Sequence, residues 1–151
     1  MDQPLKPAAA PWLIKRRVLP QHTDHAGVLW HGAYVAWLEE ARVEALAAAG
    51  IAYANLSATG LELMVVELQL NYRRPLLHGE LVELRSWLEV GKGLRLPFHS
   101  QFVAADRAAA VSIAAEAQVV LALVDRPSGR PCRRMPEELK LAMARLASGP
   151  L

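Results

Sequence analysis

The stretch His22–Arg42, HTDHAGVLWHGAYVAWLEEAR, joins a polar loop directly to a helical pattern. From Ala33 to Ala49 the chain is rich in Ala, Leu and Glu and contains neither Gly nor Pro, which favours a helix that Gly50 then stops. Arg42 on this helix needs a buried acceptor such as Glu39, one turn earlier. One helical stripe carries Val35, Leu38, Arg42, Ala45, Leu46 and Ala49.

Outside this helix the dominant pattern has the period of two that is typical of half-buried strands. It predicts strands over 12–20, 64–72, 82–90, 94–102 and 111–123, with turns over 55–60, 91–93 and 106–107. A short helix follows Pro136. A strand, a long helix and then four strands joined by short turns predict an α+β domain, with one antiparallel sheet wrapped around one principal helix.

Composition narrows the class of protein. The chain has 151 residues, 53% of them hydrophobic, and a formal net charge of only +2, which fits one globular domain and argues against nucleic-acid binding. No apolar run is long enough to cross a bilayer, and no signal peptide is evident. We therefore expect a single domain over 12–151 and a flexible, proline-broken arm over 1–11. The lone Cys132 is compatible with a cytoplasmic location.

The loop invites three interpretations. His22, His25 and His31 suggest a metal site, but their spacing matches no known helical or cysteine-based ligand pattern, so we predict none. Asp, Thr and Gly also serve simply as turn residues. The third interpretation is chemical, because Asp24 is a carboxylate that precedes a helix N-terminus.

A helix N-terminus offers unpaired N–H groups and a positive dipole end, which suit an oxygen that becomes negative during attack on a carbonyl. A carboxylate beside it can act as a general base or as a nucleophile. The loop therefore supplies both groups that acyl hydrolysis needs, while the turn interpretation of Asp24 stays open.

These residues resemble the signature of hotdog-fold acyl-CoA thioesterases of the 4-hydroxybenzoyl-CoA thioesterase-like group. There the loop reads close to D-T-D-x-x-G-V-V-Y-H-x-N-Y, and an aromatic residue, an acidic residue and an Arg follow on the helix. The later segment LQLNYRRPLLHGELVEL at 68–84 is similar to the strand pattern of the group, so the resemblance runs from about Trp12 to Asp125. The matching positions are Thr23, Asp24, Gly27, Val28, His31, Tyr34, Trp37, Glu39 or Glu40, and Arg42.

The resemblance implies a hotdog fold, in which a five-stranded antiparallel sheet curls around the helix over 32–50. It also implies edge-to-edge dimers, often doubled to tetramers, with the active site at the dimer interface. Asp24 matches the catalytic carboxylate, and His31 stands where a backbone N–H polarises the thioester carbonyl. The chain departs from the pattern at His22, which replaces the first Asp, at Trp30, which replaces Tyr, and at Ala33, which replaces Asn.

The remaining site residues follow from their position. Gly27, Val28, Trp30, Gly32 and Tyr34 are predicted to bind substrate around the loop. Arg74, Lys92 and Arg95 are candidates to bind the phosphates of coenzyme A, with a solvated surface role as the alternative. The same two roles apply to the denser patch of Arg126, Arg130, Arg133 and Arg134.

The expected function is hydrolysis of an acyl-CoA thioester to a free acid and coenzyme A, by a homodimer or homotetramer without metal or cofactor. Asp24 would act as nucleophile or general base, with the oxyanion site near His31. One alternative is a thioesterase specific for aromatic CoA esters of quinone synthesis, of the 1,4-dihydroxy-2-naphthoyl-CoA type. The other is a protein that binds acyl-CoA or acyl carrier protein without catalysis, which a fold alone does not exclude.

Overall fold

The structure is a computed structural model, and it describes residues 10–91, 93–105 and 112–150. Most of the predicted N-terminal arm, Lys92 and the predicted turn at Asp106–Arg107 lie outside the described residues.

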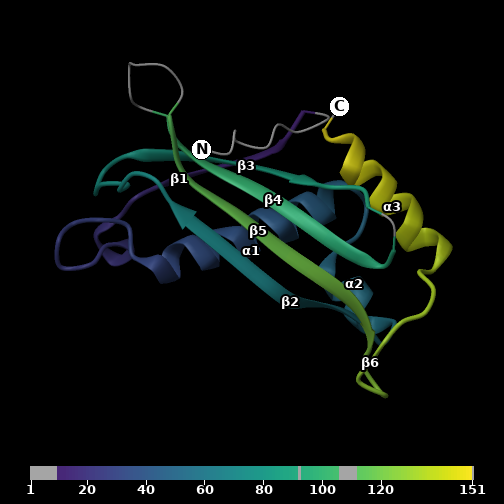
Figure 1. The fold of residues 1–151 in the computed structure, drawn as a ribbon. Helices are drawn as coiled ribbons and strands as arrows, with labels where there is room; N and C mark the ends of the chain where they lie inside the picture. Colours follow the sequence, from purple (N-terminus) through teal and green to yellow (C-terminus); the bar gives the residue numbers. More distant parts are fainter. Residues whose placement is uncertain (1–9, 92, 106–111, 151) are drawn as a thin grey trace.

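Five antiparallel strands form a sheet in the order β1-β3-β4-β5-β2, and a two-residue β6 extends it beside β5 (Figure 1). This confirms the predicted five-stranded antiparallel sheet. In chain order the elements are β1 (Trp12–Arg17), the 3-10 helix η1 (Pro20–His22), α1 (His31–Ala48), α2 (Tyr53–Ala58), β2 (Leu61–Tyr72), β3 (Leu81–Leu88), β4 (Arg95–Ala104), β5 (Ile113–Asp125), β6 (Arg130–Pro131) and α3 (Glu137–Ser148).

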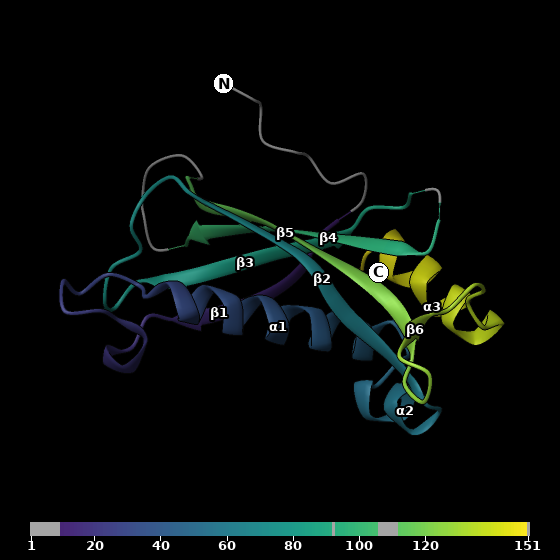
Figure 2. The same ribbon diagram turned by 60° about the horizontal axis from the view of Figure 1, so that its bottom comes forward.

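The sheet curves over α1, which lies along its concave side (Figure 2). Leu46 of α1 and Leu84, Phe102 and Leu121 of the sheet are fully buried between the two layers. The ring of Tyr34 lies 4.9 Å from that of Phe102, in an edge-on contact. This apolar interface fixes the direction of α1, and it confirms the α+β hotdog architecture predicted from the sequence.

The predicted helical stripe faces this interface, with one exception. Leu38, Arg42, Ala45, Leu46 and Ala49 are buried, but Val35 remains 43% exposed. The helix also begins two residues earlier than its composition predicted, at His31.

Strand β2 differs from its prediction as a half-buried strand. It begins at Leu61, its pairing with β5 is interrupted by a bulge between Val65 and Glu67, and it forms an edge of the sheet. Its apolar side chains Met64, Val65, Val66, Leu68 and Tyr72 are each 44–55% exposed. A strand with only one neighbour cannot cover both of its sides, so this row of apolar groups stays open to solvent.

Other differences are local. Residues 55–60 were predicted to be a turn, but α2 ends only at Ala58. Strand β1 stops at Arg17 instead of Pro20, and Val90, predicted to lie in a strand, follows β3 and is 77% exposed.

The C-terminal helix α3 forms as predicted, and Arg145 on it donates a hydrogen bond of 3.4 Å to the carbonyl of Ala49, at the end of α1. In the part of the chain that the structure describes, no helix is both long and apolar enough to cross a membrane.

Candidate active site

The loop before α1 is pinned to the connection between β2 and β3. The N–H of Leu29 donates a 2.7 Å hydrogen bond to the carbonyl of Leu76, and the N–H of His78 donates one of 3.0 Å to the carbonyl of Gly27. A β-bridge pairs Val28 with Leu77. The backbone of the loop is therefore held in place by hydrogen bonds to the segment between β2 and β3.

Asp24 organises the tip of this loop with one of its two carboxylate oxygens. Its Oδ1 accepts hydrogen bonds from the N–H groups of Ala26, at 2.9 Å, and Val28, at 3.2 Å. The carbonyl of Asp24 accepts the N–H of Gly27, whose φ of +75° is a conformation that suits glycine. Asp24 is exposed, and its Oδ2 accepts no hydrogen bond from the described residues. Asp24 thus stabilises the turn through Oδ1, and its Oδ2 stays available for chemistry.

The loop ends at the N-terminus of α1. Trp30 is the N-cap and gives no side-chain hydrogen bond to the helix, so the first N–H groups, at His31 and Gly32, have no acceptor within α1. The ring of Trp30 folds over Gly32, where a Cβ would collide with the indole. It also contacts the ring of His31, with centroids 5.0 Å apart. Glycine at position 32 therefore allows the exposed Trp30 ring to lie beside the helix start.

The histidines of the loop have separate surroundings. His22 accepts the N–H of Leu19 on Nδ1 at 3.1 Å, and its ring contacts Trp37 edge-on at 5.3 Å. His25 and His31 are exposed. Across the residues that the structure describes, no three His, Cys, Asp or Glu side chains are grouped as metal ligands would be. His22, which replaces the first Asp of the motif, has a role in folding the loop.

Tyr34 lies in the core, although it was predicted to bind substrate. Its side chain is 2% exposed and contacts Tyr72 and Phe102. Burial, together with the nearby Tyr72 and Glu80, raises the pKa of the Tyr34 phenol to about 12. This position favours a packing role for Tyr34.

Two of the predicted phosphate ligands, Arg74 and Arg95, do not come together within one chain. Arg74 follows β2 at the same end of the sheet as the Asp24 loop, and its N–H bonds to the carbonyl of Ala114 at 2.9 Å. Arg95 begins β4 opposite Ala122, which in turn lies opposite Met64 of β2. From Met64 to Tyr72 the strand runs about 27 Å at 3.4 Å per residue, so Arg95 lies at the far end of the sheet. Arg126 and Arg130, of the basic patch, lie at that far end too.

A hollow of about 330 Å³ lies between α1 and the open edge of β2. Leu38 and the half-exposed Val35 line it from α1, and Met64, Val65 and Leu68 line it from β2. The hollow therefore explains why Val35, alone in the predicted stripe, is not covered: it borders a cavity of a size typical of ligand sites.

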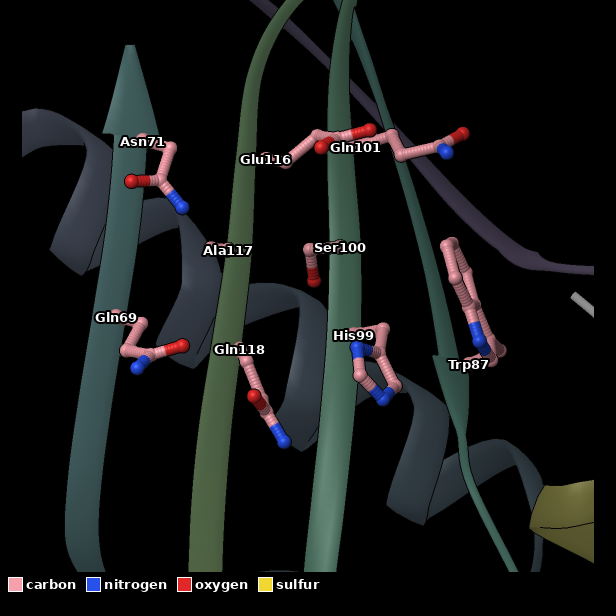
Figure 3. A pocket seen from close by; sticks show the side chains of 9 residues that line it. All are labelled: Gln69, Asn71, Trp87, His99, Ser100, Gln101, Glu116, Ala117 and Gln118. Carbon is pink, nitrogen blue, oxygen red and sulfur yellow. The ribbon is translucent and has the colours of Figure 1, made fainter. Parts of the chain in front are cut away.

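A second, more polar hollow lies on the opposite face of the sheet, with α1 behind the strands (Figure 3). There His99 is 6% exposed, stacks on Trp87 with ring centroids 5.6 Å apart, and has its Nε2 2.5 Å from Glu89 Oε2. The burial of His99 depends on the strand register, which places it directly opposite Trp87. The sheet separates this hollow from α1, so it lies apart from the candidate site.

Comparison with known proteins places the whole arrangement in a family. The family model of the thioesterase-like superfamily matches residues 18–143, most of the chain. The chain belongs to the thioesterase-like superfamily. The recognised resemblance and the predicted class of enzyme, a thioesterase, are thereby confirmed.

Individual relatives agree with this assignment. The Synechocystis protein sll0410 is 34% identical over 136 residues, which cover 89% of this chain and 80% of that protein. The acyl-CoA thioester hydrolase YbgC of Escherichia coli is 28% identical over 123 residues, covering 82% of this chain and 88% of that protein. The structure of a 1,4-dihydroxy-2-naphthoyl-CoA thioesterase from Synechocystis superposes with a TM-score of 0.78 at 18% identity, over 88% of this chain and 95% of that one. This last likeness concerns the hotdog fold.

Proposed function

We propose that this member of the superfamily hydrolyses an acyl-CoA thioester to a free acid and coenzyme A, with Asp24 as its catalytic carboxylate. One observation carries the proposal: Asp24 is fixed through Oδ1 by two backbone N–H groups, while its Oδ2 is left without a partner among the described residues. The loop that holds it ends at uncapped N–H groups of α1. The likeness to YbgC, named as an acyl-CoA thioester hydrolase, supports the class of substrate.

In the general-base route, Asp24 takes a proton from water as the water oxygen attacks the thioester carbonyl carbon. The N–H groups of His31 and Gly32, at the positive end of α1, stabilise the oxyanion that forms. The C–S bond then breaks, and the thiolate of coenzyme A recovers the proton from Asp24.

In the nucleophilic route, Asp24 itself attacks the carbonyl carbon and expels the thiolate, and water then hydrolyses the resulting anhydride. The two routes differ in where oxygen from water goes. In a single turnover in H₂¹⁸O, the nucleophilic route labels the Asp24 carboxylate when water attacks the Asp24 carbonyl of the anhydride, whereas the general-base route labels only the released acid.

The proposal includes a dimer that forms through β2. An exposed edge strand with five half-exposed apolar side chains is a surface that a second copy can cover by continuing the sheet. In such a dimer the two β2 strands would run antiparallel. The far end of one sheet would therefore lie near the Asp24 loop of the other subunit. Arg95 of one subunit and Arg74 of the other then become joint candidates for the phosphates of coenzyme A. Pairing of two dimers into a tetramer is part of the same proposal.

A thiol-release assay of the full chain tests the proposal. The panel comprises aromatic, short-chain and long-chain acyl-CoAs, and we expect thiol release from at least one of them. Binding of acyl-CoA without thiol release from any member would favour the alternative, a non-catalytic acyl-CoA-binding protein. A preference for aromatic esters would support the narrower substrate class.

A further inference from the structure

The hollow beside α1 contains an arginine that its surroundings do not satisfy. Arg42 lines the cavity and is only 7% exposed. Its Nε–H is buried and has no hydrogen-bond partner in the described part of the chain. The sequence predicted Glu39 as its acceptor, but no hydrogen bond joins the two side chains. Buried polar groups in folded proteins are normally hydrogen-bonded, so a lone buried donor that lines a cavity indicates a missing acceptor.

Burial also opposes the charge of this side chain. The pKa of the Arg42 guanidinium is lowered by desolvation, although Tyr53 and Glu39 act in the opposite direction. The phenol of Tyr53 already donates its proton to the carbonyl of Leu63, at 2.8 Å. The groups around Arg42 therefore do not fully offset the loss of hydration of its charge.

The position of Arg42 on α1 relates it to the helix N-terminus. His31, Val35, Leu38 and Arg42 are spaced by four, three and four residues, which places them along one face of the helix. At 1.5 Å per residue, the Cα atoms of His31 and Arg42 are about 16 Å apart along the axis. Side chains lean toward the helix N-terminus, so the guanidinium lies closer to His31 than its Cα does. An acyl group that starts at the proposed oxyanion site has an apolar path along this face, with Arg42 at its end.

We propose that Arg42 is a specificity-determining residue, which donates its Nε–H to a neutral oxygen at the far end of the acyl group. This inference rests on the proposed function. The oxygen of the acyl group must be neutral, because Glu39 and Glu62 line the same hollow and repel a carboxylate. A hydroxyl fits this setting best, because it accepts a hydrogen bond from an arginine and donates one to a carboxylate.

The test uses straight-chain acyl-CoAs from butanoyl to dodecanoyl, each with and without a terminal hydroxyl. At one chain length or more, we expect the hydroxyl to raise kcat/KM at least tenfold, equivalent to about 1.4 kcal/mol. In Arg42→Met, which keeps the volume of the side chain and removes its donors, the two members of each pair should become nearly equal. The terminal carboxylate, tested as suberoyl-CoA, should be a poorer substrate than its hydroxyl counterpart.

A matched control removes the same charge elsewhere. Arg16→Met disrupts an exposed ion pair of 2.7 Å with Glu40 of α1, which does not line the hollow, and should preserve the preference for the hydroxyl. Thermal unfolding and size-exclusion chromatography of both variants report folding and assembly. If Arg42→Met dissociates the protein and lowers kcat/KM equally for both members of each pair, Arg42 has a partner in the subunit interface and the proposal is overturned.

A second measurement separates this proposal from the proposed function. Alkyl thioethers of coenzyme A, with and without a terminal hydroxyl, cannot be hydrolysed, and calorimetry gives their affinities directly. Tighter binding of the hydroxylated thioethers that is lost in Arg42→Met supports the role of Arg42, even if no acyl-CoA is cleaved. Hydrolysis without any preference for the hydroxyl, at any chain length, refutes it and leaves the thioesterase proposal intact.

Discussion

Two substitutions of Asp24 separate its role in the loop from its proposed role in catalysis. Asparagine retains Oδ1, so Asp24→Asn keeps an acceptor for the N–H groups of Ala26 and Val28. Alanine removes both hydrogen bonds, which contribute about 0.5–1.5 kcal/mol each. Since water reaches this exposed site, we expect Asp24→Ala to lower the free energy of unfolding by about 1–2 kcal/mol, and Asp24→Asn to change it little.

Both variants should lose activity to a similar extent. A positioned general base contributes about 10²–10⁴-fold to the rate. At about 1.36 kcal/mol per tenfold, this corresponds to about 2.7–5.4 kcal/mol of the activation barrier. Thiol release from the best acyl-CoA of the panel gives kcat, and urea unfolding gives the free energy of unfolding of each variant.

Asp125→Asn is the matched control. Asp125 holds a turn in the same way, since its Oδ2 accepts hydrogen bonds from the N–H and hydroxyl of Ser128 at 3.2 and 2.6 Å. It lies at the other end of the sheet, so its variant should keep full activity. If Asp24→Asn hydrolyses the substrate within a few-fold of the wild-type rate, Asp24 has only the turn role and the mechanism is wrong.

Three further predictions concern the core, the edge of the sheet and a buried phenol. Phe102→Ala should lower the free energy of unfolding by about 3–5 kcal/mol, because Phe102 is fully buried, whereas the exposed Val90→Ala should change it by less than about 0.5 kcal/mol; urea unfolding measures both. Val66→Lys should convert the proposed dimer to a monomer in size-exclusion chromatography, while Leu13→Lys, similarly exposed on β1 at the opposite edge, should leave the elution volume unchanged. Raising the pH from 9 to 11 should destabilise the protein by about 1.4 kcal/mol, because the phenol of Tyr34 ionises near pH 10 when unfolded and at a pKa of about 12 when folded; the full difference of about 2.7 kcal/mol develops only above pH 12. In Tyr34→Phe this part of the pH dependence should disappear, and an unchanged slope in unfolding experiments would show that other groups cause it.

The long helix was predictable because its determinants are local. Composition, helical spacing and Gly50 all lie within the segment itself, and the structure ends α1 at Ala48. Helix α2 was missed for the opposite reason. Its six residues carry no capping side chain, and contacts distant in sequence support it: Leu56 is buried, and Tyr53 bonds to the carbonyl of Leu63.

The same distinction between local determinants and contacts distant in sequence applies to the candidate site. Asp24 and the helix start near His31 are adjacent in sequence, so a local motif was enough to find them. The separation of Arg74 from Arg95 depends on strand register and on the order of strands in the sheet, which a single sequence does not reveal. The exposed row on β2 was mistaken for a buried one because alternation shows which side chains share a face, but not whether another strand lies alongside.

The attachment of the Asp24 loop to the connection after β2 has a consequence for engineering. Leu29 and Gly27 are bonded to Leu76 and His78, so the two segments behave as one mechanical unit. Adding or deleting a residue between Arg73 and Glu80 would displace Asp24 although no residue of its own loop had changed. Efforts to alter the substrate range by exchanging loops should therefore transplant residues 19–30 and 73–80 together, as a single cassette.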